Sequence, residues 1–482
     1  MQTSEISPKL DTKNQGQVFT PGWMVNLMLD HCKYWGTGIL RRHVIDNSCG
    51  DGAFLIPIVH RYIQAALQSG LSHKAIRRHL TTYIHGIEKD PQVHARCLSN
   101  LERVAAAYGF RDIPWDIRLA DALTLTAFDG QMHYVIGNPP YVRIHHLTHT
   151  DSTLRSYTFS DRYNTDLYIT FYDLGIRMLS DQGKLCYITP CSWLYSSSGK
   201  RMRDYLVAQC LLTDMVSMGH TQVFPGITTY TVITGLTKGQ RSETFRYYVF
   251  DEGTQTFLFQ DELPLSEAYI DGRFYLGDQK SLATVRSVKH QQIPAHVRVK
   301  NGLATLADKV FINSLVPDSP YTIQAYKAST GQWSRCFYPY DRQAKPLSEG
   351  QVFASHSLAD YLISNKQALQ DRDIRHDAWW QYGRTQALND TYKSKLAVNM
   401  LLRDEHDIKY AFVAPGQVVY SGYYVTTDSP EVLDRLPALL TSPAFASYVM
   451  ALGKYKSGGY YTFNALDLEQ YLNFQIQQTV KP

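Results

Sequence analysis

Paired cysteines are missing from this sequence of 482 residues. Its seven cysteines stand singly with no CxxC pair, a pattern that fits neither a disulfide framework nor a zinc cluster. No apolar run approaches the roughly 18–20 residues that cross a membrane, and the N-terminal stretch MQTSEISPKLDTKNQGQ has no apolar core of a secretory leader. The sequence therefore predicts a soluble, cytoplasmic protein with no membrane partner.

A strong charge of one sign is also lacking. The formal net charge is only +4, and 19% of the residues are charged against 44% hydrophobic, which is typical of a globular protein. The small basic surplus lies after residue 285, where 21 Lys and Arg stand against 17 Asp and Glu, and it weakly favours an anionic partner there. The length makes two domains the default expectation.

Strand-like runs alternate with helical patterns through the first half of the chain. This alternation predicts an α/β fold with a Rossmann-like, doubly wound sheet, in which ligands bind beyond the carboxyl ends of the strands. The expected strands are 43–48, 82–88, 117–121, 134–138, 184–190, 214–219 and 230–236, and the expected helices are 53–68, 91–108, 165–180 and 198–210.

The loop after the first expected strand, IDNSCGDGAFL at 45–55, places a carboxylate and two glycines between a strand and a helix. Gly50 and Gly52 allow a tight turn and a close approach of the backbone to a ligand. Neither GxGxxG nor a Walker lysine is present, so the loop suits a nucleoside with a zwitterionic tail better than a triphosphate. An ordinary tight turn between strand and helix is the alternative.

Two further acids end the next two expected strands. Glu88 lies where a doubly wound fold places the acid that accepts hydrogen bonds from ribose hydroxyls, and Asp121 ends the third strand. Each alone could be a solvated carboxylate or a helix cap. Together with Asp46 they predict one adenosine-sized site.

The fourth expected strand ends in VIGNPPYVRI, residues 135–144. Pro139 and Pro140 deny two consecutive backbone N–H donors and stop both strand and helix. If the Asn138 side-chain oxygen and the Pro139 carbonyl each accept one N–H of an exocyclic amine, its nitrogen is drawn toward tetrahedral geometry and becomes nucleophilic. Tyr141 offers an aromatic face on which a flat base can stack.

On these motifs, residues 14–240 resemble the γ-class DNA adenine-N6 methyltransferases of the TaqI-like and Eco57I-like type. The resemblance implies S-adenosylmethionine as cofactor and double-stranded DNA as partner. It implies cofactor-binding roles for the loop residues Asp46, Ser48 and Gly50 and for Glu88 and Asp121, and catalytic roles for Asn138, Pro139, Pro140 and Tyr141. The loop departs from the family pattern, because Asn47 and Ser48 replace a commoner Pro-Ala pair.

Two other segments resemble the same family. GQVFTP at 16–21 matches a segment that closes over the methionine end of the cofactor, which adds Phe19 and Thr20 to the expected cofactor site. Thr20 as N-cap and Pro21 as first helical residue would also start a helix there. In QVFPGITTYTVITGL at 222–236, Phe224 corresponds to the phenylalanine that faces a flipped base opposite Tyr141. Phe224 could equally be an ordinary core residue.

The remainder of the chain is rich in Tyr, Trp and Gln, and the alternation of strands and helices fades. We expect a catalytic domain at 1–245 and a DNA target-recognition domain of mixed structure at 246–482. Arg384 and Gln386 are residue types that read G and A edges in a major groove. Lys454 and Lys456 are candidate phosphate contacts. All four could instead brace the domain.

The sequence gives little indication of a metal site or of a nuclease. The histidines of HLTHTD at 146–151 have no companion Cys or Glu at zinc spacing, and Asp407-Ile-Lys409 is the only hint of a nuclease motif. We therefore expect no metal and no fused endonuclease. The favoured function is site-specific methylation of adenine N6 in DNA, alone or beside a separate restriction endonuclease. A protein-glutamine or RNA-base methyltransferase and a catalytically idle DNA-recognition subunit are the alternatives.

Overall fold

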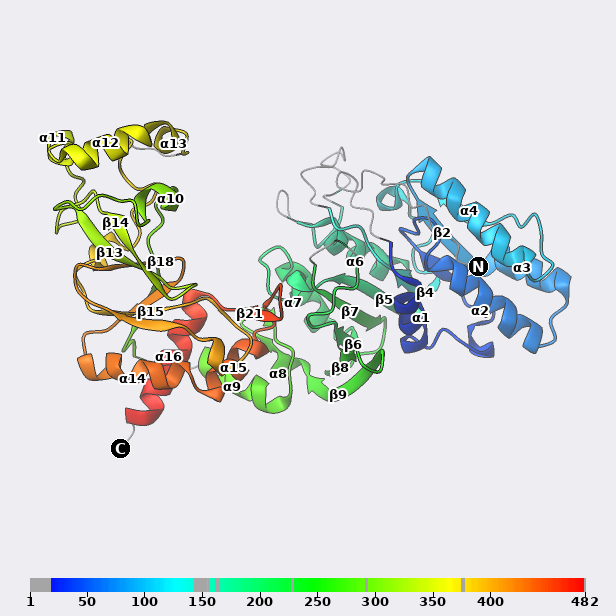
Figure 1. Ribbon diagram of the computed structural model, residues 1–482. Coiled ribbons are helices and arrows are strands. Elements are labelled where there is room, and N and C mark those ends of the chain that lie inside the picture. Colours follow the sequence, from blue (N-terminus) through cyan, green and yellow to red (C-terminus); the bar gives the residue numbers. More distant parts are fainter. Residues whose placement is uncertain are drawn as a thin grey trace. The chain divides into compact units, whose positions relative to one another are not determined.

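The computed structural model describes residues 19–142, 154, 156–160, 165–224, 226, 229–290, 294–373 and 378–480 (Figure 1). The chain divides into two compact units, Met1–Leu282 and Ala283–Pro482. The first unit ends later than the boundary expected at residue 245, because two further strands continue its sheet. The division of roles between the two units remains a prediction.

The first unit is built on a nine-stranded sheet with the order β3-β2-β1-β4-β5-β7-β6-β8-β9. All seven expected strands are present, with shifted ends. The strands are β1 Val44–Asp46, β2 Ile84–Glu88, β3 Asp116–Leu119, β4 Met132–Gly137, β5 Leu179–Pro190, β6 Leu212–Ser217, β7 Thr231–Thr237, β8 Thr244–Asp251 and β9 Thr256–Pro264.

Strand β1 lies between β2 and β4 and pairs in parallel with both. The chain runs outward from β1 through β2 to β3, then returns to the other side of β1 to form β4 and β5. This change of direction opens a crevice at the carboxyl ends of β1 and β4, where doubly wound sheets bind their ligands. The fold therefore selects one edge of the sheet for a site.

The expectation of a simple doubly wound sheet needs correction, because the sheet is mixed. Strand β7 runs antiparallel to both β5 and β6, and β9 runs antiparallel to β8. Parallel neighbours need a crossover connection, whereas β7 follows β6 without a described helix between them, and β9 follows β8 through a short turn. Neither β8 nor β9 was expected as part of this sheet.

Helices pack on the sheet of the first unit as the alternating pattern predicted. Helices α2, α3 and α4 contact β2, and α6 contacts β4 and β5. The helix α3 was not expected, although Ser72 caps it by accepting from the Ala75 N–H. The helices are α1 Gly22–His31, α2 Leu55–Gln68, α3 His73–Tyr83, α4 Pro91–Ala106, α6 Leu167–Met178, α7 Lys200–Ala208 and the short α8 Leu265–Ala268, which is followed by the hairpin β10 Tyr269–Ile270 and β11 Arg273–Phe274.

The start of α1 differs from the expectation by one residue. Pro21, with ψ 142°, is the N-cap rather than the first helical residue, and the helix begins at Gly22. Thr20 therefore lies outside the cap position. Its buried hydroxyl makes a different contact, with Asn138.

The described residues of the second unit form three small sheets. Their orders are β12-β19-β15-β17, β14-β13-β18 and β16-β21-β20. The strands are β12 Arg298–Asn301, β13 Thr322–Lys327, β14 Gln332–Phe337, β15 Lys395–Val398, β16 Leu401–Leu402, β17 Tyr410–Val413, β18 Val418–Tyr420, β19 Tyr423–Thr426, β20 Tyr455–Lys456 and β21 Tyr460–Thr462.

Helices of the second unit begin at recognisable sequence signals. Ser429 and Ser442 cap α14 and α15, and a proline follows each cap at the first helical position. Ser348 and Gln351 form a reciprocal capping box at α11. The helices are α10 Asp308–Phe311, α11 Glu349–Val352, α12 His356–Ser364, α13 Lys366–Gln370, α14 Pro430–Leu440, α15 Pro443–Ala451 and α16 Ala465–Val480, while α9 Gln279–His290 spans the division between the units.

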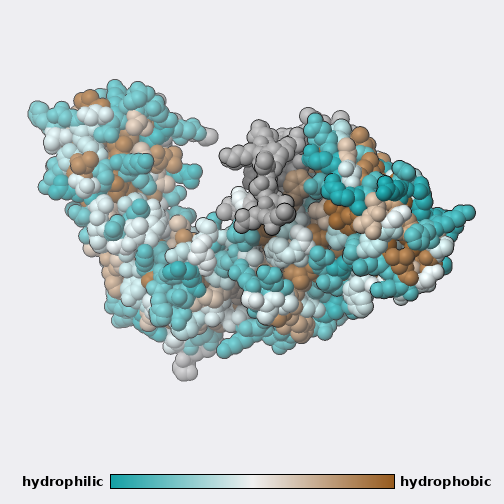
Figure 2. All heavy atoms as spheres, turned by 45° about the vertical axis from the view of Figure 1, so that its right-hand side comes forward, coloured by the Kyte–Doolittle hydropathy of each residue, from teal (hydrophilic) through white to brown (hydrophobic). Residues whose placement is uncertain are grey.

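Hydrophilic residues predominate on the face drawn in Figure 2, and hydrophobic residues form separate patches on it. Within the described part of the chain, no helix is long and apolar enough to cross a membrane. The apolar residues gather instead in the interior, where one cluster of the first unit joins α1, α2 and α4 to the strands beside them.

Gly137, the last residue of β4, provides a test of how β1 and β4 fit together. A Cβ atom on Gly137 would lie 2.6 Å from Asp46 Oδ1. We expect Gly137→Ala to lower the free energy of unfolding by about 1–3 kcal/mol, because the buried carboxyl and the strand must shift. Chemical denaturation measures the change.

Gly38→Ala is the matched control, since a Cβ on Gly38 meets no atom within 4 Å. It should leave the stability close to that of the wild type. Equal stabilities of the two variants would show that β4 tolerates a side chain beside Asp46.

Candidate functional site

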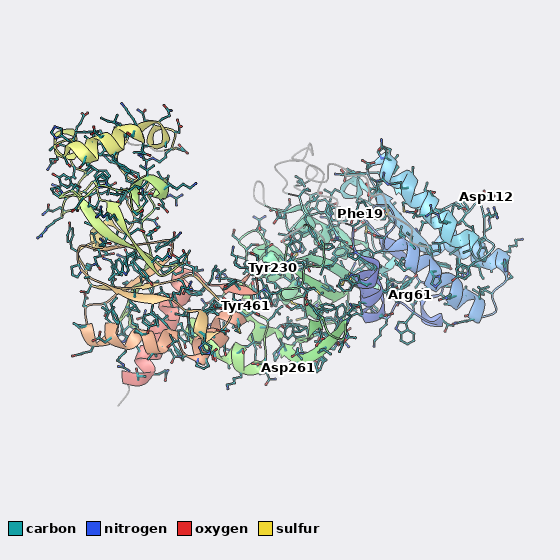
Figure 3. All side chains as sticks on the ribbon, in the orientation of Figure 1. Phe19, Arg61, Asp112, Tyr230, Asp261 and Tyr461 are labelled. Carbon is teal, nitrogen blue, oxygen red and sulfur yellow. The ribbon has the colours of Figure 1, made fainter. Side chains whose placement is uncertain are left out.

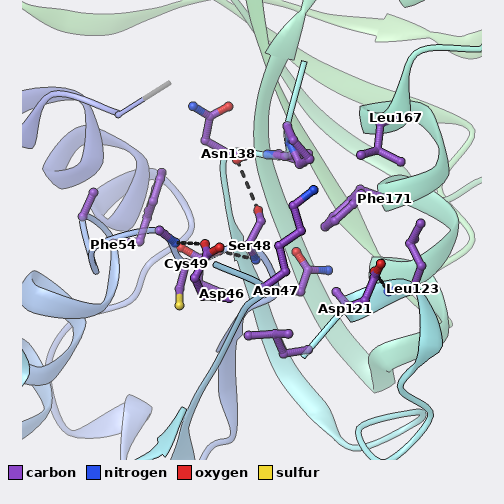
Figure 4. Close-up of a pocket in the computed structure, with 18 of the residues that line it drawn as sticks. Asp46, Asn47, Ser48, Cys49, Phe54, Asp121, Leu123, Asn138, Leu167 and Phe171 are labelled. Carbon is purple, nitrogen blue, oxygen red and sulfur yellow. Dashed lines mark hydrogen bonds between the residues drawn. The ribbon is translucent and has the colours of Figure 1, made fainter. Parts of the chain in front are cut away.

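A cavity lies at the carboxyl ends of β1, β2 and β4, and its empty volume is about 920 Å³ including its open mouth. All seven expected cofactor residues line it, together with Asn138, Pro139 and Pro140. Figure 4 labels Asp46, Ser48, Asp121 and Asn138 among them. Its full lining is Phe19, Thr20, Asp46, Asn47, Ser48, Cys49, Gly50, Ala53, Phe54, Ile87, Glu88, Lys89, Ala120, Asp121, Ala122, Leu123, Asn138, Pro139, Pro140, Leu167 and Phe171. The structure thus brings together residues more than 150 positions apart in the sequence.

Asp46 is the most deeply buried carboxyl of the cavity. It ends β1, is 1% exposed, and accepts a 3.1 Å hydrogen bond at Oδ1 from the Ser48 N–H. Burial raises the pKa of Asp46 to about 7, and the nearby Glu88 adds to the increase while the Ser48 N–H opposes it. A cation placed in the cavity would favour the ionised carboxylate.

Glu88 holds the turn at Gly50 in the loop that follows β1. Its Oε2 accepts from the Gly50 N–H at 3.1 Å, and its Oε1 accepts from the Asp90 N–H at 2.8 Å. Gly50 has φ +56°, in the left-handed region that glycine adopts readily. The carboxylate that was expected to bind ribose therefore also fixes the shape of the loop beside it.

Asp121 lies two residues beyond β3 and caps the short 3-10 helix Ala122–Thr124. Its Oδ1 accepts from the Leu123 N–H at 3.0 Å. The structure thus shows Asp121 as a helix cap that also lines the cavity, and its role in cofactor binding remains a prediction. Phe19, labelled in Figure 3, is 45% exposed, and its Cε1 lies 3.7 Å from the position of a Cβ on Gly50.

Asn138 is in contact with two polar residues of the cavity wall. Its Nδ2 donates to Thr20 Oγ1 at 3.1 Å. Its backbone carbonyl accepts from Ser48 Oγ at 3.3 Å (Figure 4). Thr20 is 6% exposed. The loop after β1 thus contacts the backbone of Asn138, and the segment before α1 contacts its side chain.

Tyr141 lies outside this cavity and lines a neighbouring one, with Asp166, Tyr168, Pro190, Cys191, Ser192, Tyr195, Thr229 and Tyr230. Its hydroxyl donates to the Ile188 carbonyl at 3.1 Å, which fixes the ring against β5. The structure therefore separates the expected stacking residue from the cavity that the expected cofactor residues line. The segment Asn138–Tyr141 joins the two.

Phe224 has a different setting from the one expected for it. Its ring is 1% exposed and meets the Tyr141 ring edge to face, with centroids 5.9 Å apart. It lines neither cavity, so it presents no open face to a base in this conformation. A stacking role for Phe224 remains a prediction that requires its ring to become exposed.

Sequence reasoning missed the apolar part of the cavity. Phe54, Leu123, Leu167 and Phe171 contribute buried side chains to it. Leu167 and Phe171 are four residues apart on α6 and therefore share a face of that helix. That spacing was visible in the sequence, but nothing in it indicated which cavity the face would meet.

The two departures from the family loop have separate environments. Asn47 is 1% exposed, and its side-chain amide is hydrogen bonded to the Tyr187 hydroxyl, with Nδ2 at 2.8 Å. Ser48 instead contacts Asn138 through its hydroxyl. An alanine at position 48 could not make that hydrogen bond.

The four candidate DNA-contacting side chains differ in their exposure and in their partners within the protein. Arg384 and Lys456 are exposed. Gln386 donates to the Gly302 carbonyl at 2.7 Å, and Lys454 forms an ion pair with the buried carboxylate of Asp467. The last two therefore have structural partners within their own unit.

No group of three His, Cys, Asp or Glu side chains within the described ranges could hold a metal ion. The histidine segment 146–151 lies outside those ranges. Asp407 and Lys409 lie in the second unit, and Asp407 pairs with Arg403 at 2.9 Å.

Comparison with known proteins relates the chain to restriction-modification enzymes. Residues 77–224 match the Eco57I restriction-modification methylase family. The type II restriction enzyme and methyltransferase RM.Eco57I of Escherichia coli is 25% identical, over 87% of this chain and 54% of the relative. The type II methyltransferase M.BstVI of Geobacillus stearothermophilus is 26% identical over 62% of this chain and 60% of that protein. The chain thus spans little more than half the length of these two relatives.

Another relative matches along most of its own length. The type II methyltransferase M.PaeR7I of Pseudomonas aeruginosa is 25% identical, over 96% of this chain and 86% of the relative. Among solved structures, the type IIL restriction-modification enzyme MmeI in complex with DNA superposes with a TM-score of 0.59 at 14% identity, over 87% of this chain and 60% of MmeI. At that identity the superposition supports the fold alone.

The raised pKa of Asp46 predicts how stability depends on pH. Between about pH 4 and pH 7 the folded protein retains a proton that the unfolded chain has lost, so stability falls as the pH rises through this window. Asn at this position keeps the acceptor for the Ser48 N–H without ionising. We expect ligand-free Asp46→Asn to be more stable than the wild type at pH 8, by ~2 kcal/mol.

The same comparison near pH 4.5 is the control, because the wild-type carboxyl is then neutral. Denaturant unfolding at both pH values should give a difference that nearly vanishes at the lower one. A difference that is independent of pH would contradict the raised pKa.

Proposed function

The chain belongs to the Eco57I family of restriction-modification methylases, and on this premise we propose that it transfers a methyl group from S-adenosylmethionine to N6 of an adenine in double-stranded DNA. The observation that carries the proposal is the shared cavity, which joins the acids at three strand ends to the Asn138-Pro139-Pro140 segment. We further propose that the methylation protects DNA in a restriction-modification system. The names of the relatives support this biological role.

The residues of the cavity fit S-adenosylmethionine by their chemistry. Asp46 is a buried carboxyl that a positively charged group would stabilise in its ionised form. Glu88 and Asp121 are acceptors suited to ribose and adenine donors, and Phe54 and Phe171 supply apolar surface for a flat ring. S-adenosylmethionine supplies, when bound, an electrophilic methyl group on a positively charged sulfur.

Asn138 and Pro139 would activate the amine that receives the methyl group. The Asn138 side-chain oxygen and the Pro139 carbonyl each accept one N–H of the amine, which draws its nitrogen out of conjugation with the ring. The amine would accept the electrophilic methyl group that S-adenosylmethionine supplies and would then lose a proton to water. No general base is needed before attack.

An adenine stacked in a duplex cannot reach this edge of the sheet, so we propose that the base swings out. The cavity beside Tyr141 supports the idea, because it adjoins the catalytic segment and carries Tyr168, Tyr195 and Tyr230. Aromatic stacking of about 1–3 kcal/mol per base offsets part of the unstacking cost. In the second unit, exposed Arg384 and Lys456 are better placed for DNA than Gln386 and Lys454, which have partners.

Substitution of Asn138 tests the chemistry. Asn138→Ala removes an acceptor that matters most as the amine becomes tetrahedral, so it should lower kcat by at least several orders of magnitude with little change in cofactor affinity. The assay is transfer of tritium from labelled S-adenosylmethionine to duplex DNA. Exposed Asn389 offers the control, and Asn389→Ala should retain wild-type kcat.

The same assay separates the proposed substrate from its alternatives. RNA and a mixture of proteins are tested beside DNA, and incorporation only into RNA or protein would redirect the assignment. A decrease in kcat of less than about tenfold for Asn138→Ala, which is ~1.4 kcal/mol, would remove Asn138 from the catalytic role.

A fluorescent base tests the flipping step. 2-Aminopurine at the target position should brighten on binding, because it leaves the stack. It should brighten further with Tyr141→Ala, where one quenching ring is gone. Tyr141→Phe keeps the ring and loses only the hydrogen bond to Ile188, ~1 kcal/mol, so its kcat should stay within about tenfold of wild type.

Steady fluorescence on specific binding by an active enzyme would count against an extruded base. Equal losses of activity in Tyr141→Phe and Tyr141→Ala would indicate that the hydroxyl contact, rather than the aromatic face, is what the enzyme needs.

A further inference from the structure

Thr20 stands out because its observed contact differs from the roles expected for it. It is not the N-cap of α1, since Pro21 takes that position. The residue is buried and lines the cofactor cavity, and its hydroxyl accepts a hydrogen bond from Asn138 Nδ2 at 3.1 Å. Thr20 therefore borders the cavity and also contacts the residue proposed to activate the target amine.

The orientation of the Asn138 amide decides whether it can act. Only its carbonyl oxygen can accept an N–H from an amine, whereas the amide turned by 180° would present a second donor to that amine. A hydroxyl has one proton and can accept as well as donate. If the hydroxyl already donates its hydrogen bond to another acceptor, it can only accept a hydrogen bond from the amide. The amide must then present its NH₂ group to the hydroxyl oxygen.

We propose that Thr20 is a positioning residue that couples occupancy of the cofactor cavity to the orientation of Asn138. The Thr20 hydroxyl donates a hydrogen bond to a ligand acceptor in the cavity, and its oxygen then accepts from the Asn138 NH₂ group. The Asn138 carbonyl oxygen is thereby turned toward the target amine before chemistry begins. This inference rests on the proposed methyl transfer and adds a control step to it.

Ser48 supports the arrangement from the opposite side. Its hydroxyl donates to the backbone carbonyl of Asn138 at 3.3 Å. This contact holds the backbone of residue 138 while the side-chain amide keeps its rotation. The orientation of the amide is therefore left to groups that touch the side chain, among them Thr20.

Three variants separate positioning from cofactor binding. Thr20→Val has nearly the shape of threonine without the hydroxyl, Thr20→Ser retains the hydroxyl, and Thr82→Val alters an exposed threonine on α3 as the control. We expect Thr20→Val to lower kcat by about 10- to 100-fold, an effect of ~1.4–2.8 kcal/mol. The KM for DNA should change less than about threefold. The calorimetric Kd for S-adenosylmethionine should weaken by no more than about tenfold, because the variant also loses one hydrogen bond to the ligand, ~1 kcal/mol.

Rescue by the conservative variant distinguishes the hydroxyl from packing. Thr20→Ser should restore most of kcat, and Thr82→Val should match the wild type. An unchanged kcat in Thr20→Val would overturn the proposal. So would a loss confined to cofactor affinity, or a Thr20→Ser enzyme as slow as Thr20→Val. Thr20→Ala gives a second hydroxyl-free enzyme and should behave as Thr20→Val does.

A readout without catalysis keeps this inference separate from the proposed function. In protein labelled with ¹⁵N-asparagine, the side-chain amide resonance of Asn138 is assigned by its loss in Asn138→Asp. Adding S-adenosylhomocysteine should shift that resonance downfield in the wild type and leave it nearly unmoved in Thr20→Val. Equal shifts in both proteins would refute the coupling, even if the wild type methylated no DNA at all.

Discussion

The parallel pairing of β1 with β4 is the constraint on which the site depends. Ile45 lies opposite Val135 in that ladder, so the next residues of the two strands bring Asp46 alongside the end of β4. A Cβ on Gly137 would come within 2.6 Å of the Asp46 carboxyl, and only glycine allows this approach. Asn138 follows at once. The register of two strands thus places a buried acid and the proposed catalytic amide on one edge of the sheet.

Several buried polar groups lie at the same edge of the sheet, and their burial lowers the stability of the ligand-free protein. Asp46 is almost fully buried and its pKa is raised to about 7, so its ionised form destabilises the ligand-free protein. Glu88 offsets part of the polar burial by accepting two backbone N–H groups. Thr20 accepts from the side-chain amide of Asn138, and Ser48 donates to the Asn138 backbone carbonyl. This is the arrangement expected of a binding site, because a ligand of complementary charge recovers the stability that the empty site lacks.

Local motifs were enough to predict much of this site. The acids Asp46, Glu88 and Asp121 and the segment from Asn138 follow buried strands, and a doubly wound fold sends the ends of such strands to one edge. The apolar wall could not be predicted in the same way. Phe171 belongs to a helix whose described residues are nearly all buried, so its pattern does not indicate which neighbour each residue meets.

Tertiary packing decided the remaining differences. The sheet is mixed because β7 runs antiparallel to β6. The apolar residues of β7 do not indicate whether the strand is parallel or antiparallel to its neighbours. Thr20 and Pro21 were expected to start α1, yet a long-range contact with Asn138 occupies the hydroxyl. Phe224 packs against Tyr141, where the family resemblance suggested an open face. Helix propensity and sequence motifs predicted the region in which each of these residues lies. The residue that each one contacts depends on the tertiary packing.

The central claim is that the edge formed by β1 and β4 directs a methyl group to N6 of adenine. The most direct measurement is nucleoside mass spectrometry of duplex DNA after incubation with the protein and S-adenosylmethionine carrying a deuterated methyl group. The account predicts N6-methyldeoxyadenosine containing that methyl group, at one sequence context. Labelled N4-methyldeoxycytidine or 5-methyldeoxycytidine in its place, or unlabelled DNA beside labelled RNA or protein, would contradict it.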